Sequence, residues 1–195
     1  FPEDSVTSTA ATYDDNEWHH VAGVKDGTSS LKLYIDGVLV ATDSTIEATG
    51  TLENADPLYV GIDEDGTSNA WAGSMDEVKI FNYAQTPKQI IENMNAGHPI
   101  GGSPNASQIG YWKFDEGYGA IANNAGIGGS ALNGTITDAL WTNNGRVSRA
   151  LNLSGSDDRI TVTNTSSIDL NEGLASGFTI SAWYNSNTAG GSNLG

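Results

Sequence analysis

A strand followed by a short helix ends within the first half of this chain of 195 residues. Residues 74–97, SMDEVKIFNYAQTPKQIIENMNAG, begin with a strand pattern in which Met75, Val78 and Ile80 are apolar. The Thr86-Pro87 step then predicts a helix over about 86–96, which ends at Asn-Ala-Gly. A strand followed by a closing helix is typical of the end of a domain. The second half of the chain must therefore have a separate place in the fold.

Short strands separated by turns make up most of the remaining pattern. In residues 17–26, EWHHVAGVKD, alternate residues from Trp18 to Val24 share one face. Asp36-Gly37 lies between two apolar runs and predicts a two-residue hairpin of type I′. Residues 98–108 are rich in Gly, Pro, Ser and Asn and predict a linker, after which IGYWKFDEG begins a second series of strands. The sequence therefore predicts an all-β protein with one helix.

Charge and composition exclude several classes of function. The formal net charge of −16 argues against a nucleic-acid or anionic-membrane partner. No apolar run reaches the roughly 20 residues that cross a bilayer, so membrane insertion is not expected. The chain has no Cys, which excludes disulfides and thiol chemistry. It begins with Phe1 rather than Met, and we expect it to be a piece of a longer protein.

Five segments carry a family likeness. EWHHVAGVKDGTSSLKLYIDG and WAGSMDEVKIFNYAQTPKQI resemble the C-terminal part of the laminin-G-like, concanavalin A-like jelly-roll family. IGYWKFDEGYG, SRALNLSGSDDRITV and GFTISAWYNS resemble its N-terminal part. The C-terminal part thus precedes the N-terminal part in this chain. The resemblance implies that residues 1–97 are the end of one repeat, residues 98–108 are a linker, and residues 109–195 are the beginning of the next repeat.

The resemblance implies an antiparallel jelly-roll β-sandwich assembled in circularly permuted order. The first and last strands of this family are neighbours, so the two parts can close as one sandwich across the linker. Separate halves would expose apolar sheet faces and open edges, which is costly. We expect a monomer of this kind, and the alternative is a dimer in which two chains swap halves.

Related jelly rolls commonly hold a structural Ca²⁺ on the convex side, and the resemblance implies a site here. By position, Asp76 is the match for the side-chain ligand, and Asp115, Gly155 and Asp157 are candidates for the remainder. Oxygen ligands from strands and turns suit Ca²⁺, which takes six to eight of them. The alternative is that these acids are solvated strand ends and turn formers.

Catalysis is not expected from the pattern of acids and histidines. Retaining glycosidases need two carboxyl groups close together, and consecutive Asp76 and Glu77 would face opposite sides of a strand. His19 and His20 are adjacent and would also point apart, so they do not chelate one metal ion. His20 is expected to be a half-buried residue with satisfied partners.

Two tryptophans near loops are candidates for stacking on a sugar ring. If exposed, Trp71 and Trp141 could stack on a sugar ring, with Asn143, Asn144 and Asn69 as hydrogen-bond partners. The alternative is that both tryptophans cap the ends of the sandwich, because large aromatic side chains mostly bury. The sequence leaves both interpretations open.

These observations favour a non-enzymatic carbohydrate- or surface-binding (adhesion) module of a large extracellular or cell-surface bacterial protein. Its ligand would be a glycan or a cell-surface component, and its cofactor a structural Ca²⁺. Two alternatives remain, a purely structural spacer repeat and an accessory domain of a glycan-degrading enzyme. Function rests here on fold-level analogy.

Overall fold

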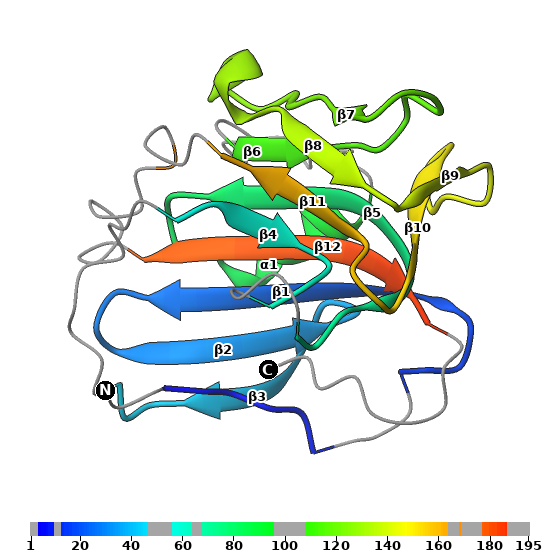
Figure 1. Ribbon diagram of the computed structural model, residues 1–195. Coiled ribbons are helices and arrows are strands. Elements are labelled where there is room, and N and C mark those ends of the chain that lie inside the picture. Colours follow the sequence, from blue (N-terminus) through cyan, green and yellow to red (C-terminus); the bar gives the residue numbers. More distant parts are fainter. Residues whose placement is uncertain are drawn as a thin grey trace.

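Two antiparallel sheets face each other in the protein. A computed structural model describes residues 4–9, 13–46, 56–63, 68–95, 108–163, 168 and 177–186. The larger sheet has eight strands and the smaller sheet has four. In Figure 1 the strands of the smaller sheet, β4, β11, β8 and β7, lie in front of and above the larger sheet. The strands are β1 Trp18–Asp26, β2 Ser30–Ile35, β3 Val38–Asp43, β4 Leu58–Val60, β5 Ala72–Phe81, β6 Gln108–Trp112, β7 Ile121–Ala122, β8 Gly134–Thr137, β9 Leu140–Thr142, β10 Ala150–Ser154, β11 Arg159–Val162 and β12 Phe178–Asn185.

The larger sheet interleaves strands from both parts of the chain. Its order is β3-β2-β1-β12-β5-β10-β9, and β6 also pairs with β5. Strand β12 lies between β1 and β5, and is antiparallel to both. The all-β jelly-roll prediction is therefore confirmed, and strands from the two predicted parts share one sheet. Most of the predicted linker, residues 98–107, lies outside the described residues, and the origin of the two parts in neighbouring repeats stays a prediction.

The predicted hairpin forms between β2 and β3. Asp36 and Gly37 have φ values of 51° and 77°, as a type I′ turn requires at both central positions. Ile35 and Val38 are paired directly across the turn. Glycine adopts such a φ without strain, and a short polar side chain such as that of Asp tolerates it.

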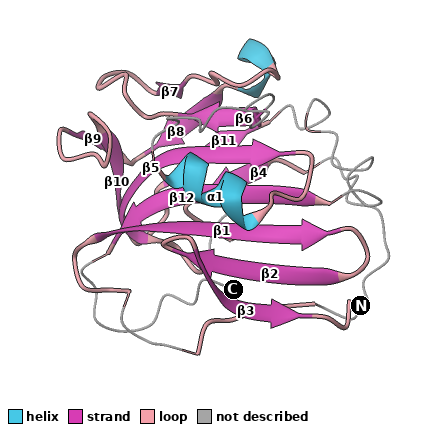
Figure 2. Ribbon diagram, turned by 180° about the vertical axis from the view of Figure 1, so that it is seen from behind, coloured by secondary structure: helices cyan, strands magenta, loops and turns pink. Residues whose placement is uncertain are grey.

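Helix α1, Pro87–Met94, covers the outer face of the larger sheet (Figure 2). Thr86 caps its first turn and forms a reciprocal capping box with Gln89. Ile90 packs into a small cluster with buried residues of β1 and β2. The helix predicted from the Thr-Pro step is confirmed, with the described helix ending at Met94.

The main core lies between the two sheets. Its members come from both sheets and the loops between them, and each is exposed over less than a tenth of its surface. They include Val78, Ile80, Ile109, Trp112, Phe114, Leu132, Leu151, Leu153, Ile160, Val162 and Tyr184. Gly134 in the smaller sheet lies against Ile160, where an added Cβ would come within 2.3 Å of that side chain. The contact shows how closely the strands of the smaller sheet pack.

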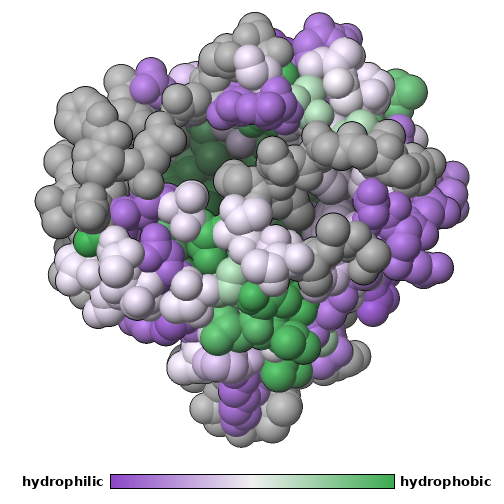
Figure 3. All heavy atoms as spheres, turned by 90° about the horizontal axis from the view of Figure 1, so that it is seen from below, coloured by the Kyte–Doolittle hydropathy of each residue, from purple (hydrophilic) through white to green (hydrophobic). Residues whose placement is uncertain are grey.

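Apolar side chains also remain exposed beside the β2–β3 turn. Val38 and Leu39 follow the turn, and Ile91 of α1 lies against Gly37 within it. Figure 3 views the molecule from below, the side on which Figure 1 places β3, and shows apolar atoms gathered near this edge. This patch is separate from the two sites described next.

Candidate functional site

Strand β5 changes its neighbour halfway along its length. On one edge it pairs with β12 throughout, but on the other edge Ala72–Met75 pair with β10, and Val78–Phe81 pair with β6. At the change, Glu77 has a φ of 54° and the register with β12 shifts between Ser181 and Trp183. An extra residue in one strand with a local φ change is a β-bulge, and bulges redirect side chains.

The bulge brings Asp76 and Glu77 to the same face of the sheet. Asp76 pairs with Trp183 and Lys79 pairs with Ser181, so both lie on the face that Ser181 and Trp183 share. Glu77 joins them, because its Oε2 lies 3.2 Å from the Lys79 Nζ. The expectation that Asp76 and Glu77 face opposite sides is therefore wrong, since the bulge interrupts the alternation.

The Asp76 carboxylate on this face is only partly satisfied. Its side chain is fully buried, and its Oδ2 accepts a hydrogen bond of 2.8 Å from the Val147 backbone N–H. Its Oδ1 is buried and has no hydrogen-bond partner among the described residues. Burial raises the Asp76 pKa to about 7, and the nearby Glu77 and Asp115 charges add to the effect. A buried carboxylate in this state is costly unless a proton or a cation neutralises it.

Asp115 lies close enough to Asp76 to raise its pKa. Asp115 Oδ1 accepts a hydrogen bond of 3.2 Å from the Arg149 backbone N–H. The loop between β9 and β10 is thus fastened at two points, to Asp76 through Val147 and to Asp115 through Arg149. These two predicted metal ligands therefore accept hydrogen bonds from the same loop.

Gly155 and Asp157, the other two predicted ligands, lie at the opposite end of β10. Gly155 packs against Ala72, which is four residues from Asp76 along β5, or about 13 Å at the usual strand rise. The Asp157 side chain is exposed and accepts a hydrogen bond from the Ser156 hydroxyl. Among the described residues no group of three or more His, Cys, Asp or Glu side chains is arranged to hold a metal. The four predicted ligands do not form one site.

Sequence reasoning missed the polar cluster next to Asp76. The Tyr111 hydroxyl donates a hydrogen bond of 2.5 Å to Glu77 Oε2, and the Lys79 Nζ lies 4.9 Å from the centre of the Tyr111 ring. Burial and the Glu77 hydrogen bond raise the Tyr111 pKa, so its proton stays on the hydroxyl. The charged residues Asp76, Glu77 and Lys79 were the signal in the sequence. The cluster could not be predicted from them alone, because its fourth member, Tyr111, lies 34 positions away from Glu77.

The predicted ligand-binding tryptophans have different surroundings. Trp71 is buried in the main core and packs edge-on against Tyr184, with ring centres 5.2 Å apart. Trp141 is half-buried and pairs with Leu151 in β10, and its Nε1–H donates to the Gly119 carbonyl at 2.9 Å. Trp71 is therefore closed to a stacking ligand, and the alternative interpretation, that it packs at the end of the sandwich, describes it better.

The residues beside Trp141 are exposed to solvent. Asn143 and Asn144, which follow it directly, are both exposed. Tyr118, adjacent to the Gly119 carbonyl that Trp141 contacts, is 79% exposed. We call Tyr118, Trp141, Asn143 and Asn144 the β9 surface; Figure 1 shows β9 at the margin of the molecule, away from β1–β3.

His20 differs from the half-buried, satisfied residue that the sequence predicts. It is 2% exposed, packs edge-on against Trp183, and its Nδ1 has no hydrogen-bond partner among the described residues. Burial, with the Lys79 charge, lowers its pKa to about 4, so its ring is neutral at physiological pH.

Comparison with protein families agrees with this architecture. Residues 2–91 match the family model Laminin_G_3, described as the concanavalin A-like lectin/glucanases superfamily. The match covers 90 of the 195 residues, and over this segment the chain is similar to that superfamily. The Laminin_G_3 segment contains β1–β5 and most of α1, including Asp76 and the bulge. Searches of curated proteins and of solved structures found no match. At the level of the superfamily, the fold supports a carbohydrate- or surface-binding module. No helix among the described residues has the length and apolar character needed to cross a membrane.

Proposed function

We propose that the protein is a non-catalytic carbohydrate-binding module for extracellular adhesion, in which Ca²⁺ at Asp76 and Asp115 supports the β9 surface. The observation that carries the proposal is the fastening of one loop to both carboxylates. Residues 143–149 begin with Asn143 and Asn144 of the β9 surface and end with the two backbone N–H groups that bind Asp76 and Asp115. Val147 lies three residues after Asn144, so a movement of the Asp76 or Asp115 carboxylate would shift the β9 surface through this short loop.

The donor atoms fit a hard cation. Asp76 Oδ1 is buried and has no partner in the part of the chain that the structure describes, while Oδ2 already accepts a hydrogen bond from the Val147 N–H. The carboxylates of Asp76 and Asp115 supply oxygen ligands, which Ca²⁺ prefers, and water or carbonyl oxygens would complete the six to eight that it takes. A cation there neutralises the carboxylate charges that burial disfavours and keeps the loop fastened.

The β9 surface has the composition of a sugar-binding surface. Tyr118 offers an exposed aromatic ring, Trp141 a partly exposed one, and the two Asn amides can each donate and accept hydrogen bonds. Ligand sites commonly combine aromatic side chains with a few polar groups that fix orientation. Neutral polysaccharides fit best, because the strongly negative chain repels polyanions.

Affinity electrophoresis against a panel of neutral polysaccharides tests the proposal. We expect retardation by at least one polysaccharide, loss of retardation in Trp141→Ala and in the double variant Asn143→Ala/Asn144→Ala, and weakening with EDTA. Val38→Ala is the matched control, because Val38 is exposed but lies on β3, at the edge of the larger sheet opposite to β9. Retardation that is unchanged in the β9 variants would refute the site, and no retardation by any polysaccharide would favour a structural spacer.

A further inference from the structure

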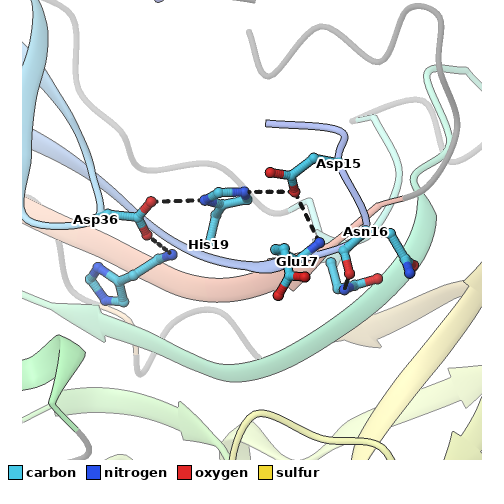
Figure 4. A network of polar contacts seen from close by, with 7 residues as sticks. Asp15, Asn16, Glu17, His19 and Asp36 are labelled. Atoms are coloured by element: carbon cyan, nitrogen blue, oxygen red, sulfur yellow. Dashed lines mark hydrogen bonds and ion pairs between the residues drawn. The ribbon is translucent and has the colours of Figure 1, made fainter. Parts of the chain in front are cut away.

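The ring of His19 lies between two carboxylates, on the face of β1 opposite to His20. Its Nδ1 lies 2.8 Å from Asp36 Oδ2, and its Nε2 lies 3.1 Å from Asp15 Oδ1 (Figure 4). The side chain of His19 is 13% exposed, whereas those of Asp15 and Asp36 are 47% and 44% exposed. A carboxylate accepts hydrogen bonds and does not donate them, so both contacts need a proton on each ring nitrogen. The geometry as it stands describes an imidazolium.

The two carboxylates are held very differently. Asp36 lies in the β2–β3 turn, where its Oδ1 accepts a bond of 2.9 Å from the His20 N–H and its own N–H donates to the His20 carbonyl at 2.8 Å. Asp15 lies in residues 13–17, outside any strand, where its Oδ1 also accepts a bond from the Glu17 N–H. Hydrogen bonds to the backbone of β1 therefore fix Asp36 in place. Asp15 lies outside the sheet, and its position depends on its contacts with His19 and Glu17.

We propose that His19 is a proton-operated latch that holds residues 13–17 against the sheet when its ring carries two protons and frees the Asp15 arm when it loses one. Neutral imidazole has a single N–H. The firmly held Asp36 retains it on Nδ1, and the Nε2 lone pair then faces the Asp15 carboxylate. The attraction at that contact becomes a repulsion.

The groups that face His19 agree with this assignment. Asp15 and Asp36 contact it directly, and the Tyr13 and Tyr184 rings pack against it with centres 5.3 and 5.8 Å away. Burial of the ring lowers the His19 pKa, but the hydrogen bonds to Asp36 and Asp15, together with the charges of these two carboxylates, outweigh it and hold the pKa above its usual value. The latch thus closes in the acidic to neutral range and opens at higher pH.

Opening the latch changes what the inner face of the sheet displays. The segment is also held by the Asn16 N–H, which donates to the Ser186 carbonyl at 2.9 Å, so its end nearer β1 stays in place. The part with Tyr13 and Asp15 is free to move away from Tyr184. Tyr13 packs against the core cluster that contains Tyr184, so the motion loosens the packing around Tyr184, whose hydroxyl is buried and has no hydrogen-bond partner among the described residues. The latch does not depend on the proposed Ca²⁺ or sugar site.

Nuclear magnetic resonance on the labelled protein tests the latch. We expect His19 to titrate above pH 6.5, to become the Nδ1–H tautomer when neutral, and to show faster exchange of the Glu17 amide above its pKa, after correction for the intrinsic pH dependence. In Asp15→Asn the His19 pKa should fall, and the amide exchange should no longer follow the titration of His19. Glu17→Gln is the matched control, because it removes a charge from the same segment without touching the ring. A neutral Nε2–H tautomer, or a titration of His19 that leaves the Glu17 amide unchanged, would overturn the proposal.

Discussion

The substitution Asp76→Asn should make the protein more stable at neutral and alkaline pH in the absence of metal. The folded state raises the pKa of Asp76 from 3.8 to about 7, so it binds that proton more tightly than the unfolded chain does. A carboxyl with a raised folded pKa contributes stability that is fully present below its unfolded pKa and is lost as the pH rises through its folded pKa. The loss therefore falls between about pH 4 and pH 7.

The size of the effect follows from the shift. A difference of about three pKa units at 1.36 kcal/mol each corresponds to about 4 kcal/mol as an upper bound. Asn keeps an oxygen to accept the Val147 N–H and carries no charge, so the variant should not show this loss. The difference in unfolding free energy between variant and wild type should therefore grow in favour of the variant from pH 4 to pH 8.

Urea denaturation in EDTA at a series of pH values measures this difference directly. Taking the difference between two proteins cancels the titration of His19, His20 and the surface acids, which both proteins share. Asp157→Asn serves as the control, because it removes an exposed carboxylate that accepts a local hydrogen bond from Ser156. If Asp76→Asn and the wild type lose stability in parallel over the whole range, the Asp76 carboxyl is not the strained group that we infer.

Three further predictions concern stability. Leu151→Ala should destabilise the protein by about 2–5 kcal/mol in urea denaturation, because Leu151 is fully buried between the sheets; a cost below 1 kcal/mol would contradict that packing. Thr86→Ala should cost about 1 kcal/mol through loss of the capping box of α1, and Thr86→Ser should recover most of it. Burial lowers the pKa of His20 to about 4 in the folded state, so its contribution to the unfolding free energy is fully present above pH 6.5 and is lost as the pH falls towards 4. His20→Phe should remove this acid sensitivity in thermal melts recorded from pH 4 to pH 8. An unchanged pH profile would mean that His20 is not buried in the neutral form.

Local signals in the sequence were sufficient for several elements. The Asp36-Gly37 turn and the Thr86-Pro87 helix start each act through contacts within a few residues, and the structure contains both. The jelly-roll class followed from the resemblance of several segments, and the Laminin_G_3 match over residues 2–91 agrees with it. Features of this kind depend on neighbouring residues and can be read before the fold is known.

The candidate site depended on contacts between distant parts of the chain. The bulge at Glu77 lies where β5 changes its neighbour from β10 to β6. No local sequence pattern predicts this change of neighbour. Asp76 and Asp115 were predicted by position in a family, and both accept hydrogen bonds from the loop between β9 and β10, whereas Gly155 lies at the other end of β10. Trp71 was placed near a loop and does lie just before β5, but its indole packs into the core against Tyr184.

Calorimetric titration of Ca²⁺ at pH 8 into the wild type, Asp76→Asn and Asp157→Asn tests the central claim most directly. The account predicts one binding event in the wild type, its retention in Asp157→Asn, and its loss in Asp76→Asn. Binding should also raise the unfolding free energy by about 2.7 kcal/mol at a hundredfold excess over Kd. Heat of binding that survives in Asp76→Asn, or none in the wild type, would contradict a cation at Asp76 and Asp115.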